Sequence, residues 1–146
     1  MLRNSPLSDV KKVYRAIKEH APKEGVPKAV LLAMVMQESH GDVGAPVTYS
    51  PENIPTGGLL QCYKCPGYEK KYNLSQDQID GMVKGGAKHF KGNMKHWGDN
   101  FDPSCIYPAL REYNSGDVNA DNLSDGRNAT DSYVSDIAQR LAGWAN

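Results

Sequence analysis

The 146-residue sequence has no long run of apolar residues and no excess of charge of either sign. A bilayer-spanning helix needs about 20 consecutive apolar residues, so we expect no membrane partner. The 17 basic and 17 acidic residues give a formal net charge of +0, whereas a general nucleic-acid-binding domain carries a marked basic excess. Gly-x-Gly-x-x-Gly and Cys-x-x-Cys-His motifs are also missing. The sequence therefore indicates neither a nucleotide nor a haem site, and we expect no cofactor.

Length and composition favour one globular domain. Domains of about 100–200 residues are common. The 39% hydrophobic and 23% charged residues are typical of a folded chain rather than a disordered one. The sequence contains no internal repeats. We therefore expect residues 1–146 to form a single, monomeric domain.

Cysteines are few and odd in number: Cys62, Cys65 and Cys105. A single disulfide leaves one thiol over, and we favour a bridge from Cys105 to either Cys62 or Cys65. Zinc is one alternative, with His89 or His96 as a further ligand, but these spacings fit four-ligand zinc motifs poorly. A redox Cys-x-x-Cys pair needs a thioredoxin-like strand and helix, whereas turn residues flank this one. We expect no metal site.

Two weaker features concern the compartment. The first six residues, Met-Leu-Arg-Asn-Ser-Pro, form no apolar signal core, and we expect Met1 to be a start placed on a processed domain. Three N-x-S/T sequons, at Asn73, Asn122 and Asn128, lie among turn-forming residues, where a glycan fits on the surface. Together with the cysteines they favour a secreted protein.

Helical periodicity dominates the sequence. Apolar residues recur at i, i+3, i+4 and i+7 after Ser8, which we expect to cap the first helix, and Pro22 and Gly25 mark its end. Pro27 suits the first turn of a second helix. Its residues 29–36 are all apolar, as in a buried central helix. Further helices are expected over 79–97, 106–113 and 130–141.

The helix expected over 79–97 carries two local signals. Ser75 and Gln78 resemble a capping box just ahead of it. Inside it, Gly85 and Gly86 each cost about 1 kcal/mol relative to alanine, so we expect a neighbouring segment to pack closely there.

The segment 41–58 has a different texture, because glycine and proline recur through it and favour turns. We expect a small loop or β lobe here, with a short strand at 47–49. The expected fold class is thus mainly α, with five or six helices around a buried central helix and one small lobe.

Three short segments stand out in order along the chain: Gln-Glu-Ser-His-Gly at 37–41, Gly-Gly-Leu-Leu-Gln at 57–61, and Ala-Leu-Arg-Glu-Tyr-Asn-Ser-Gly at 109–116. This ordered set resembles the lytic transglycosylases and goose-type lysozymes of glycoside hydrolase family 23. That family shows an apolar helix ending in Glu-Ser, a Gly-Leu-Met-Gln-like turn and an Ala-Tyr-Asn-Ala-Gly-like segment. The likeness extends to Asp-Ser-Tyr-Val at 131–134, and it covers residues 10–144.

The resemblance implies a lysozyme-like α+β fold in which residues 41–61 form one wall of a cleft. It also implies cleavage of the β-1,4 bonds of bacterial peptidoglycan, with the glycan strands as partner and Glu38 as general acid. Physical reasoning supports that role, because residues 30–36 upstream are apolar. Partial burial and the negative end of a helix both raise the pKa of a carboxyl group, as a glycosidic acid requires. The alternative is a surface glutamate at a helix end.

The remaining site residues follow from the resemblance alone. Tyr113 is expected near Glu38 or the reacting sugar, and Asn114 on the glycan. The alternatives are a core tyrosine and a helix-ending asparagine. Four further residues are expected to bind substrate: Ser50, Leu59, Leu60 and Gln61. Leu60 stands where the family usually has methionine.

The second carboxylate is where the sequence departs from the family. Goose-type enzymes carry an acid two positions after the Gly-Leu-Met-Gln turn, and Tyr63 occupies that place here. Asp42 and Glu52 are the candidates, with Glu52 preferred for its distance along the chain from Glu38. Lytic transglycosylases manage with one glutamate, so hydrolysis and internal transfer both stay open.

Two other functions compete with this hypothesis. A chitinase uses the same acid on a polymer with the same linkage and N-acetylglucosamine unit. A non-catalytic glycan-binding module keeps the aromatic residues and the cleft but needs no buried acid at Glu38. A small disulfide-stapled inhibitor is a more distant third, since it needs none of the three motifs.

Overall fold

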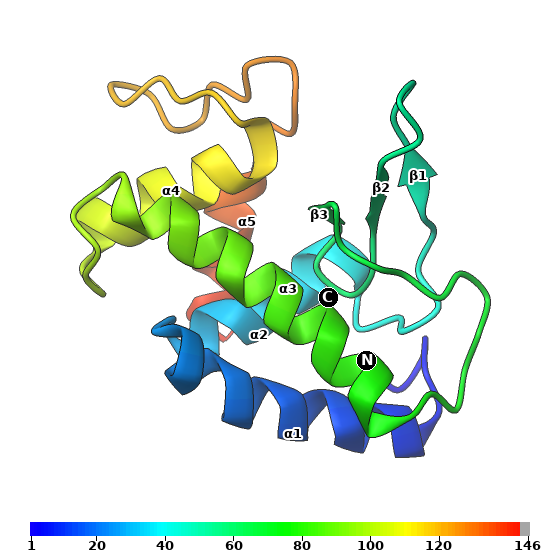
Figure 1. Ribbon diagram of the computed structural model, residues 1–146. Coiled ribbons are helices and arrows are strands. Elements are labelled where there is room, and N and C mark those ends of the chain that lie inside the picture. The colour runs from blue at the N-terminus through cyan, green and yellow to red at the C-terminus, as the bar shows by residue number, and fades with distance from the viewer. Residues whose placement is uncertain (144–146) are drawn as a thin grey trace. The chain divides into compact units, whose positions relative to one another are not determined.

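The computed structural model describes residues 1–143 of the chain. The chain forms two compact units, Met1–Lys88 and His89–Asn146, called here the first and second unit. Their boundary falls inside one long helix. The described part contains five helices and three short antiparallel strands (Figure 1), which confirms the expected mainly α fold with a small β lobe.

Helix α1 (Leu7–Glu24) packs against helix α2 (Lys28–Ser39) in the first unit. Gly25 ends α1 in the left-handed conformation, with φ of 73°, as its place in the sequence predicts. The expected Ser8 cap is wrong, because α1 begins at Leu7, with Pro6 rather than Ser8 as its N-cap and without a side-chain cap. The Ser8 hydroxyl instead donates a hydrogen bond to Asn73 Oδ1 at 3.3 Å.

Helix α2 supplies much of the core of the first unit. Its apolar residues are buried on most sides, as expected for a central helix; Val30, Leu31, Ala33, Met34 and Val35 are all at most 6% exposed. Pro27 precedes the helix as its N-cap rather than lying in its first turn.

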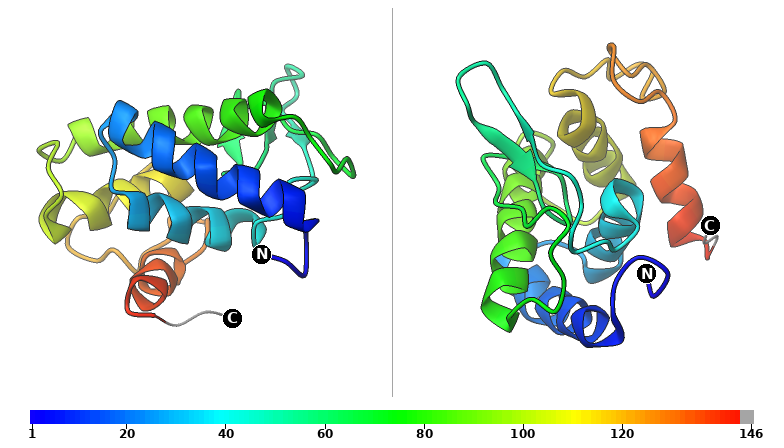
Figure 2. Two further views of the ribbon diagram at one scale, coloured as in Figure 1. Left: turned by 90° about the horizontal axis from the view of Figure 1, so that it is seen from below. Right: turned by 90° about the vertical axis from the view of Figure 1, so that its right-hand side faces the viewer.

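The β lobe consists of β1 (Thr48–Tyr49), β2 (Pro55–Gly57) and β3 (Cys62–Tyr63), paired antiparallel in that order. Thr48 pairs with Thr56, and Thr56 in turn pairs with Tyr63. Between β1 and β2 the chain extends beyond the sheet as a narrow loop (Figures 1 and 2). The strand expected at 47–49 is therefore present over its last two residues.

Helix α3 (Gln76–Lys95) runs from the first unit into the second. The predicted capping box at its start is confirmed, because the Ser75 amide donates to Gln78 Oε1 at 2.9 Å and the Gln78 amide donates to Ser75 Oγ at 3.1 Å. The close packing expected at its glycines is also present. A Cβ on Gly86 would lie 2.5 Å from Leu60 Cβ, and one on Gly85 would lie 3.2 Å from Cys65 Sγ.

Helices α4 (Pro103–Ser115) and α5 (Tyr133–Leu141) pack on each other in the second unit. Helix α4 is three residues longer at its start than the periodicity predicts, with Asp102 as N-cap and Pro103 in the first turn. Helix α5 begins at Tyr133, slightly later than expected. Of the family-like segment, which runs to Trp144, that last residue lies outside the described residues.

The expected disulfide pairing is wrong. Cys62 and Cys65 are bonded to each other across a tight turn, with their Cα atoms 5.2 Å apart, a separation typical of disulfides. Cys105 is a free thiol, buried in α4, where its Sγ donates to the Met94 carbonyl at 3.4 Å. The bridge therefore closes a turn just after Gln61 and ties no distant helix to it.

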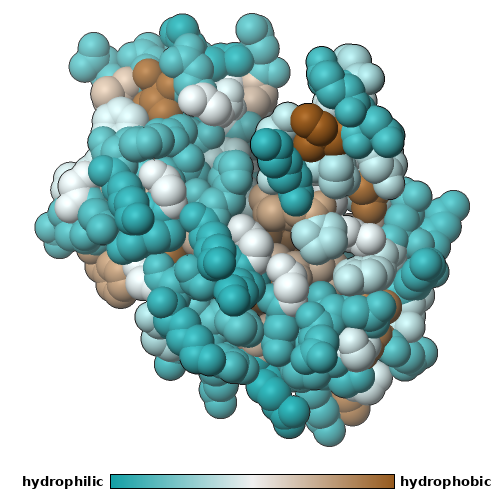
Figure 3. Space-filling model, viewed as in Figure 1, coloured by the Kyte–Doolittle hydropathy of each residue, from teal (hydrophilic) through white to brown (hydrophobic). Residues whose placement is uncertain are grey.

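The face of the molecule drawn in Figure 3 is mainly polar. Hydrophilic residues predominate there, and apolar ones form only small patches. No helix in the described part of the chain combines the length and apolar character needed to cross a lipid bilayer.

Candidate functional site

Glu38 lies in the last turn of α2 and is half-buried. The helix ends one residue later, at Ser39, because His40 adopts the left-handed conformation with φ of 54° and Gly41 follows with φ of 73°. The His40 amide donates to the Met36 carbonyl at 3.1 Å. The local sequence thus places the half-buried Glu38 at the end of α2, where the chain turns away.

Ser39 joins the first motif to the second. Its hydroxyl is buried and lies 3.0 Å from the Val35 carbonyl, one turn back in α2, and 2.8 Å from the Leu59 carbonyl. Leu59 belongs to the Gly-Gly-Leu-Leu-Gln turn, twenty positions along the chain. The structure therefore brings the helix end that carries Glu38 against the turn that the resemblance pairs with it.

The N-terminal segment fastens the other side of this helix end. Ser5 Oγ donates to the Gly41 carbonyl at 2.9 Å and accepts from the Val43 amide at 3.0 Å. The Asn4 side-chain amide donates to the His40 carbonyl at 3.1 Å. These bonds hold the backbone that leaves Glu38, and nothing in the sequence pattern indicated that residues 4–5 would do so.

The Gly-Gly-Leu-Leu-Gln turn differs from expectation at its leucines. Leu59 and Leu60 are 0% and 1% exposed, so their side chains present no surface to a substrate. Leu60 is covered by α3 at Gly86. The expectation that these two residues line a cleft is corrected: they are core residues that hold the turn in place.

Gln61 is the residue of this turn with a polar side chain. It is half-buried, with φ of 43°, and its Nε2 donates to the carbonyls of Pro46 and Gly58 at 2.9 and 3.0 Å. These bonds occupy both amide hydrogens, so the group left to meet a ligand is the Oε1 acceptor. It matches the N–H of an N-acetyl sugar.

Ser50 and Glu52 lie in the loop between β1 and β2. Ser50 closes this loop, because its hydroxyl accepts from the Ile54 amide at 3.2 Å and its amide donates to the Ile54 carbonyl at 3.0 Å. Glu52 is exposed near the tip of the loop. Two tyrosines of the same lobe, Tyr49 and Tyr63, are 63% and 47% exposed, as a sugar-stacking surface requires.

Asp42, the other candidate for a second carboxylate, is engaged locally. Its Oδ1 accepts from the Gly44 amide at 2.8 Å, which shapes the turn after Gly41. Its charge and a hydrogen bond raise the pKa of the Tyr72 hydroxyl. Asp42 therefore acts as a turn residue in this structure.

Tyr113 and Asn114 lie in the second unit, at the end of α4. Tyr113 is half-buried and packs edge-on against His89 and Phe90, with ring centroids 5.2 and 6.3 Å away. Asn114 Oδ1 accepts from the guanidinium of Arg111 and from the Thr130 amide. Asn114 thus ties α4 to the segment before α5.

Two charged residues that sequence reasoning passed over organise this helix end. Arg111 is 0% exposed, and burial lowers the pKa of its guanidinium. It donates to the carbonyls of Leu123 and Asp131, both at 3.4 Å. The only signal in the sequence was a charged residue at an apolar position of the α4 pattern.

Glu112 is the second of them. Its carboxylate lies 2.8 Å from His96 Nδ1 and accepts from Trp97 Nε1 at 3.1 Å and from the side-chain amide of Asn93. These partners connect the end of α3 to α4. Because carboxylates accept strong hydrogen bonds, these contacts hold α4 in place at Glu112, the residue directly before Tyr113.

Comparison with protein-family models, with curated proteins and with solved structures finds no match.

Proposed function

We propose that this chain cleaves the β-1,4 bonds between N-acetylmuramic acid and N-acetylglucosamine in peptidoglycan, with Glu38 as the general acid. The observation that best supports this proposal is the hydrogen bond from the Ser39 hydroxyl to the Leu59 carbonyl. It sets the half-buried Glu38 beside the turn that bears Gln61. An acid and an acceptor for a sugar amide thereby share one corner of the first unit.

The chemistry asked of Glu38 is proton transfer to the departing glycosidic oxygen, while positive charge develops on the sugar ring. A glutamate at the edge of the core suits this task better than a solvated one. Gln61 Oε1 accepts from the N-acetyl group and so orients the sugar. The exposed Tyr49 and Tyr63 offer ring faces for further sugars of the strand.

One acid suffices in this proposal. Asp42 is held by the Gly44 amide, and Glu52 lies on an exposed loop, where a carboxylate is free to move. The N-acetyl group of the substrate then supports the reacting carbon in place of a second carboxylate. Either water or a substrate hydroxyl completes the reaction.

Product masses after digestion of purified peptidoglycan test the proposal. The wild-type chain should release muropeptides that end either in reducing sugars or in 1,6-anhydro rings, and the difference of one water in mass separates hydrolysis from internal transfer. A polymer of N-acetylglucosamine serves as the second substrate. Release from this polymer alone would replace peptidoglycan by chitin as the substrate. No release from either, with binding retained, would make the chain a glycan-binding module.

Glu52→Gln addresses the second carboxylate in the same assay. If one acid suffices, this variant should keep activity within a few-fold of the wild type, because the loop carboxylate takes no part in the reaction. A loss comparable to that of Glu38→Gln would instead make Glu52 the residue that orients the attacking water.

A further inference from the structure

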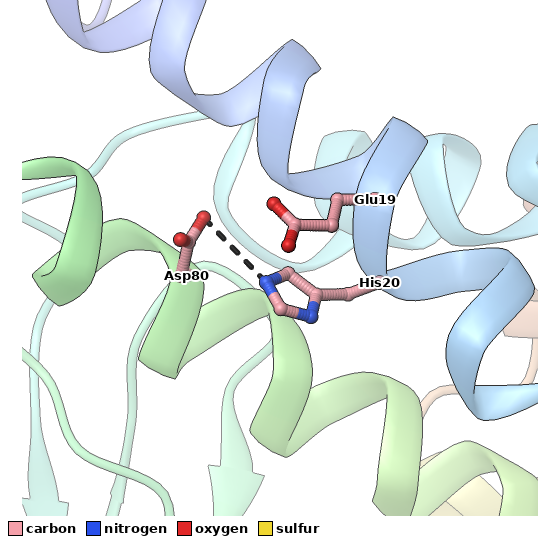
Figure 4. A group of neighbouring side chains, drawn as sticks. All are labelled: Glu19, His20 and Asp80. Atoms are coloured by element: carbon pink, nitrogen blue, oxygen red, sulfur yellow. Dashed lines mark ion pairs between the residues drawn. The ribbon is translucent and has the colours of Figure 1, made fainter.

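A second group of chemically active side chains lies in the first unit, outside the Glu38 region. Glu19 and His20 belong to α1, and Asp80 belongs to α3 (Figure 4). One ligand atom from each, a ring nitrogen or a carboxylate oxygen, lies within 4.8 Å of the others. In Figure 4 the three side chains converge on the space between the two helices.

His20 is the unusual member of this group. It is only 8% exposed, yet neither ring nitrogen has a hydrogen-bond partner among the described residues. Its Nε2 faces Asp80 Oδ1 at 3.6 Å, which is too long for a hydrogen bond. A buried polar group without a partner costs about 1–3 kcal/mol, and such a group calls for an explanation.

A metal ion between the two side chains accounts for this spacing. Zinc binds histidine nitrogen and carboxylate oxygen at about 2.0–2.2 Å, and two ligands of one tetrahedral zinc lie about 3.3 Å apart. The 3.6 Å from His20 Nε2 to Asp80 Oδ1 is close to that value. The exposed Glu19 offers a carboxylate oxygen within 4.8 Å of both of these ligand atoms.

The surroundings of Asp80 suit a ligand. The side-chain amide of Gln76 donates to Asp80 Oδ1 at 2.8 Å and also donates to the Lys12 carbonyl of α1 at 3.0 Å. Hydrogen bonds of this kind orient ligating carboxylates in metal sites. Gln76 therefore fixes Asp80 relative to α1, the helix that supplies the other two ligands.

We propose that Glu19, His20 and Asp80 bind one zinc ion that joins α1 to α3. Imidazole favours zinc and related transition metals over magnesium or calcium, and water completes the tetrahedron. Lys23 competes with the ion, because its ammonium lies 2.8 Å from Glu19 Oε1 and lowers the pKa of that carboxyl. This site shares no residue with the Glu38 region and does not depend on the proposed activity.

Isothermal titration of the chelator-treated full-length chain with zinc chloride tests the proposal. We expect one zinc per chain and no competition from equimolar magnesium. His20→Gln should weaken binding at least about a hundredfold, because loss of a supporting residue alone costs about 10–100-fold in metal affinity. Affinity should also fall with decreasing pH, since the ligands must be deprotonated.

Two surface variants keep the test decisive even if His20→Gln fails to fold. Glu19→Gln should weaken zinc binding about tenfold or more, whereas Lys23→Gln should strengthen it several-fold by releasing Glu19. His96→Gln is the matched control, because His96 also lies beside a carboxylate but in the second unit. Absence of zinc binding by the folded wild-type chain would overturn the proposal. So would zinc binding unchanged in both Glu19→Gln and Lys23→Gln, or lost in His96→Gln alone.

Discussion

The two helix ends that carry the predicted site residues are held in different ways. At the end of α2, short uncharged side chains bond to backbone carbonyls: Ser39 to Leu59 and Ser5 to Gly41. At the end of α4, charged side chains make the contacts: Arg111 is buried, and the Glu112 carboxylate contacts three side chains. The first arrangement rests on serine hydroxyl groups, whereas the second commits the Glu112 carboxylate to holding the structure.

The largest effect should come from Glu38, the proposed general acid at the first of these helix ends. Glu38→Gln keeps shape and hydrogen bonding but removes the transferable proton, which is typically worth about 10²–10⁴-fold. Lysis of purified cell walls should fall at least about a hundredfold, while the melting temperature and glycan binding stay near wild type. Full activity in this variant would refute the proposed function.

Substitution of Glu112 should instead lower the stability of the fold. Glu112→Ala leaves the donors of Asn93 and Trp97 without their acceptor, and we expect a loss of about 2–4 kcal/mol in the free energy of unfolding. Urea denaturation measures it. Asp121→Ala, at an exposed residue of the same unit, serves as the control and should change stability by less than about 0.5 kcal/mol. Equal stability of the two variants would contradict a structural role for Glu112.

A smaller effect on stability is expected where Leu60 packs on α3, and the same helix offers a matched control. Gly86→Ala places a Cβ against Leu60 and should cost about 1–3 kcal/mol through overpacking. Gly81 lies in the same helix with nothing within 4 Å of an added Cβ. Gly81→Ala should therefore stabilise the protein by about 0.5–1 kcal/mol through helix propensity. Thermal unfolding of both variants should shift in opposite directions, and shifts of the same sign would contradict the close contact.

The smallest effect on stability is expected from the serines. Because the ends of α2 and α4 each carry one, their variants compare the two helix ends most directly. Ser39 reaches the Val35 and Leu59 carbonyls, whereas Ser115 reaches those of Arg111 and Asp117, two positions on. Ser39→Ala should cost about 1 kcal/mol and also lower lytic activity, because the turn with Gln61 loosens. Ser115→Ala should cost no more and leave activity unchanged. Equal activity in the two variants would show that the Ser39 bond does not position the site.

Elements with local causes were the ones that the sequence predicted well. Periodicity reports which face of a helix is buried, so the five helices were expected near their observed places. The Ser75–Gln78 box also follows from neighbouring residues alone. The glycine pair inside α3 indicated close packing, but not that Leu60 supplies it at Gly86. The disulfide did not follow, because cysteine pairing depends on which sulfurs meet in space. Cys62 and Cys65 meet across one turn, whereas Cys105 is buried with Met94.

The parts of the site that escaped prediction depend on contacts between distant residues. Asp9, outside the site, shows the same dependence: it lies in the first turn of α1, yet its buried carboxylate accepts from the amides of Asn73 and Leu74. The prediction that Leu59 and Leu60 line a cleft failed for the same reason, because no local pattern distinguishes a cleft-lining leucine from one covered by a helix. For Glu112, its three partners lie 15 to 19 positions away.

The Ser39 hydroxyl has one hydrogen and two acceptors within reach. It can donate to only one of them at a time, so a rotation about its C–O bond exchanges one bond for the other. If the turn bearing Gln61 moves away by a few tenths of an ångström, the hydrogen returns to the Val35 carbonyl and remains bonded. The corner that holds Glu38 can therefore widen and narrow without leaving a buried donor unpaired, so small movements there have a low energetic cost.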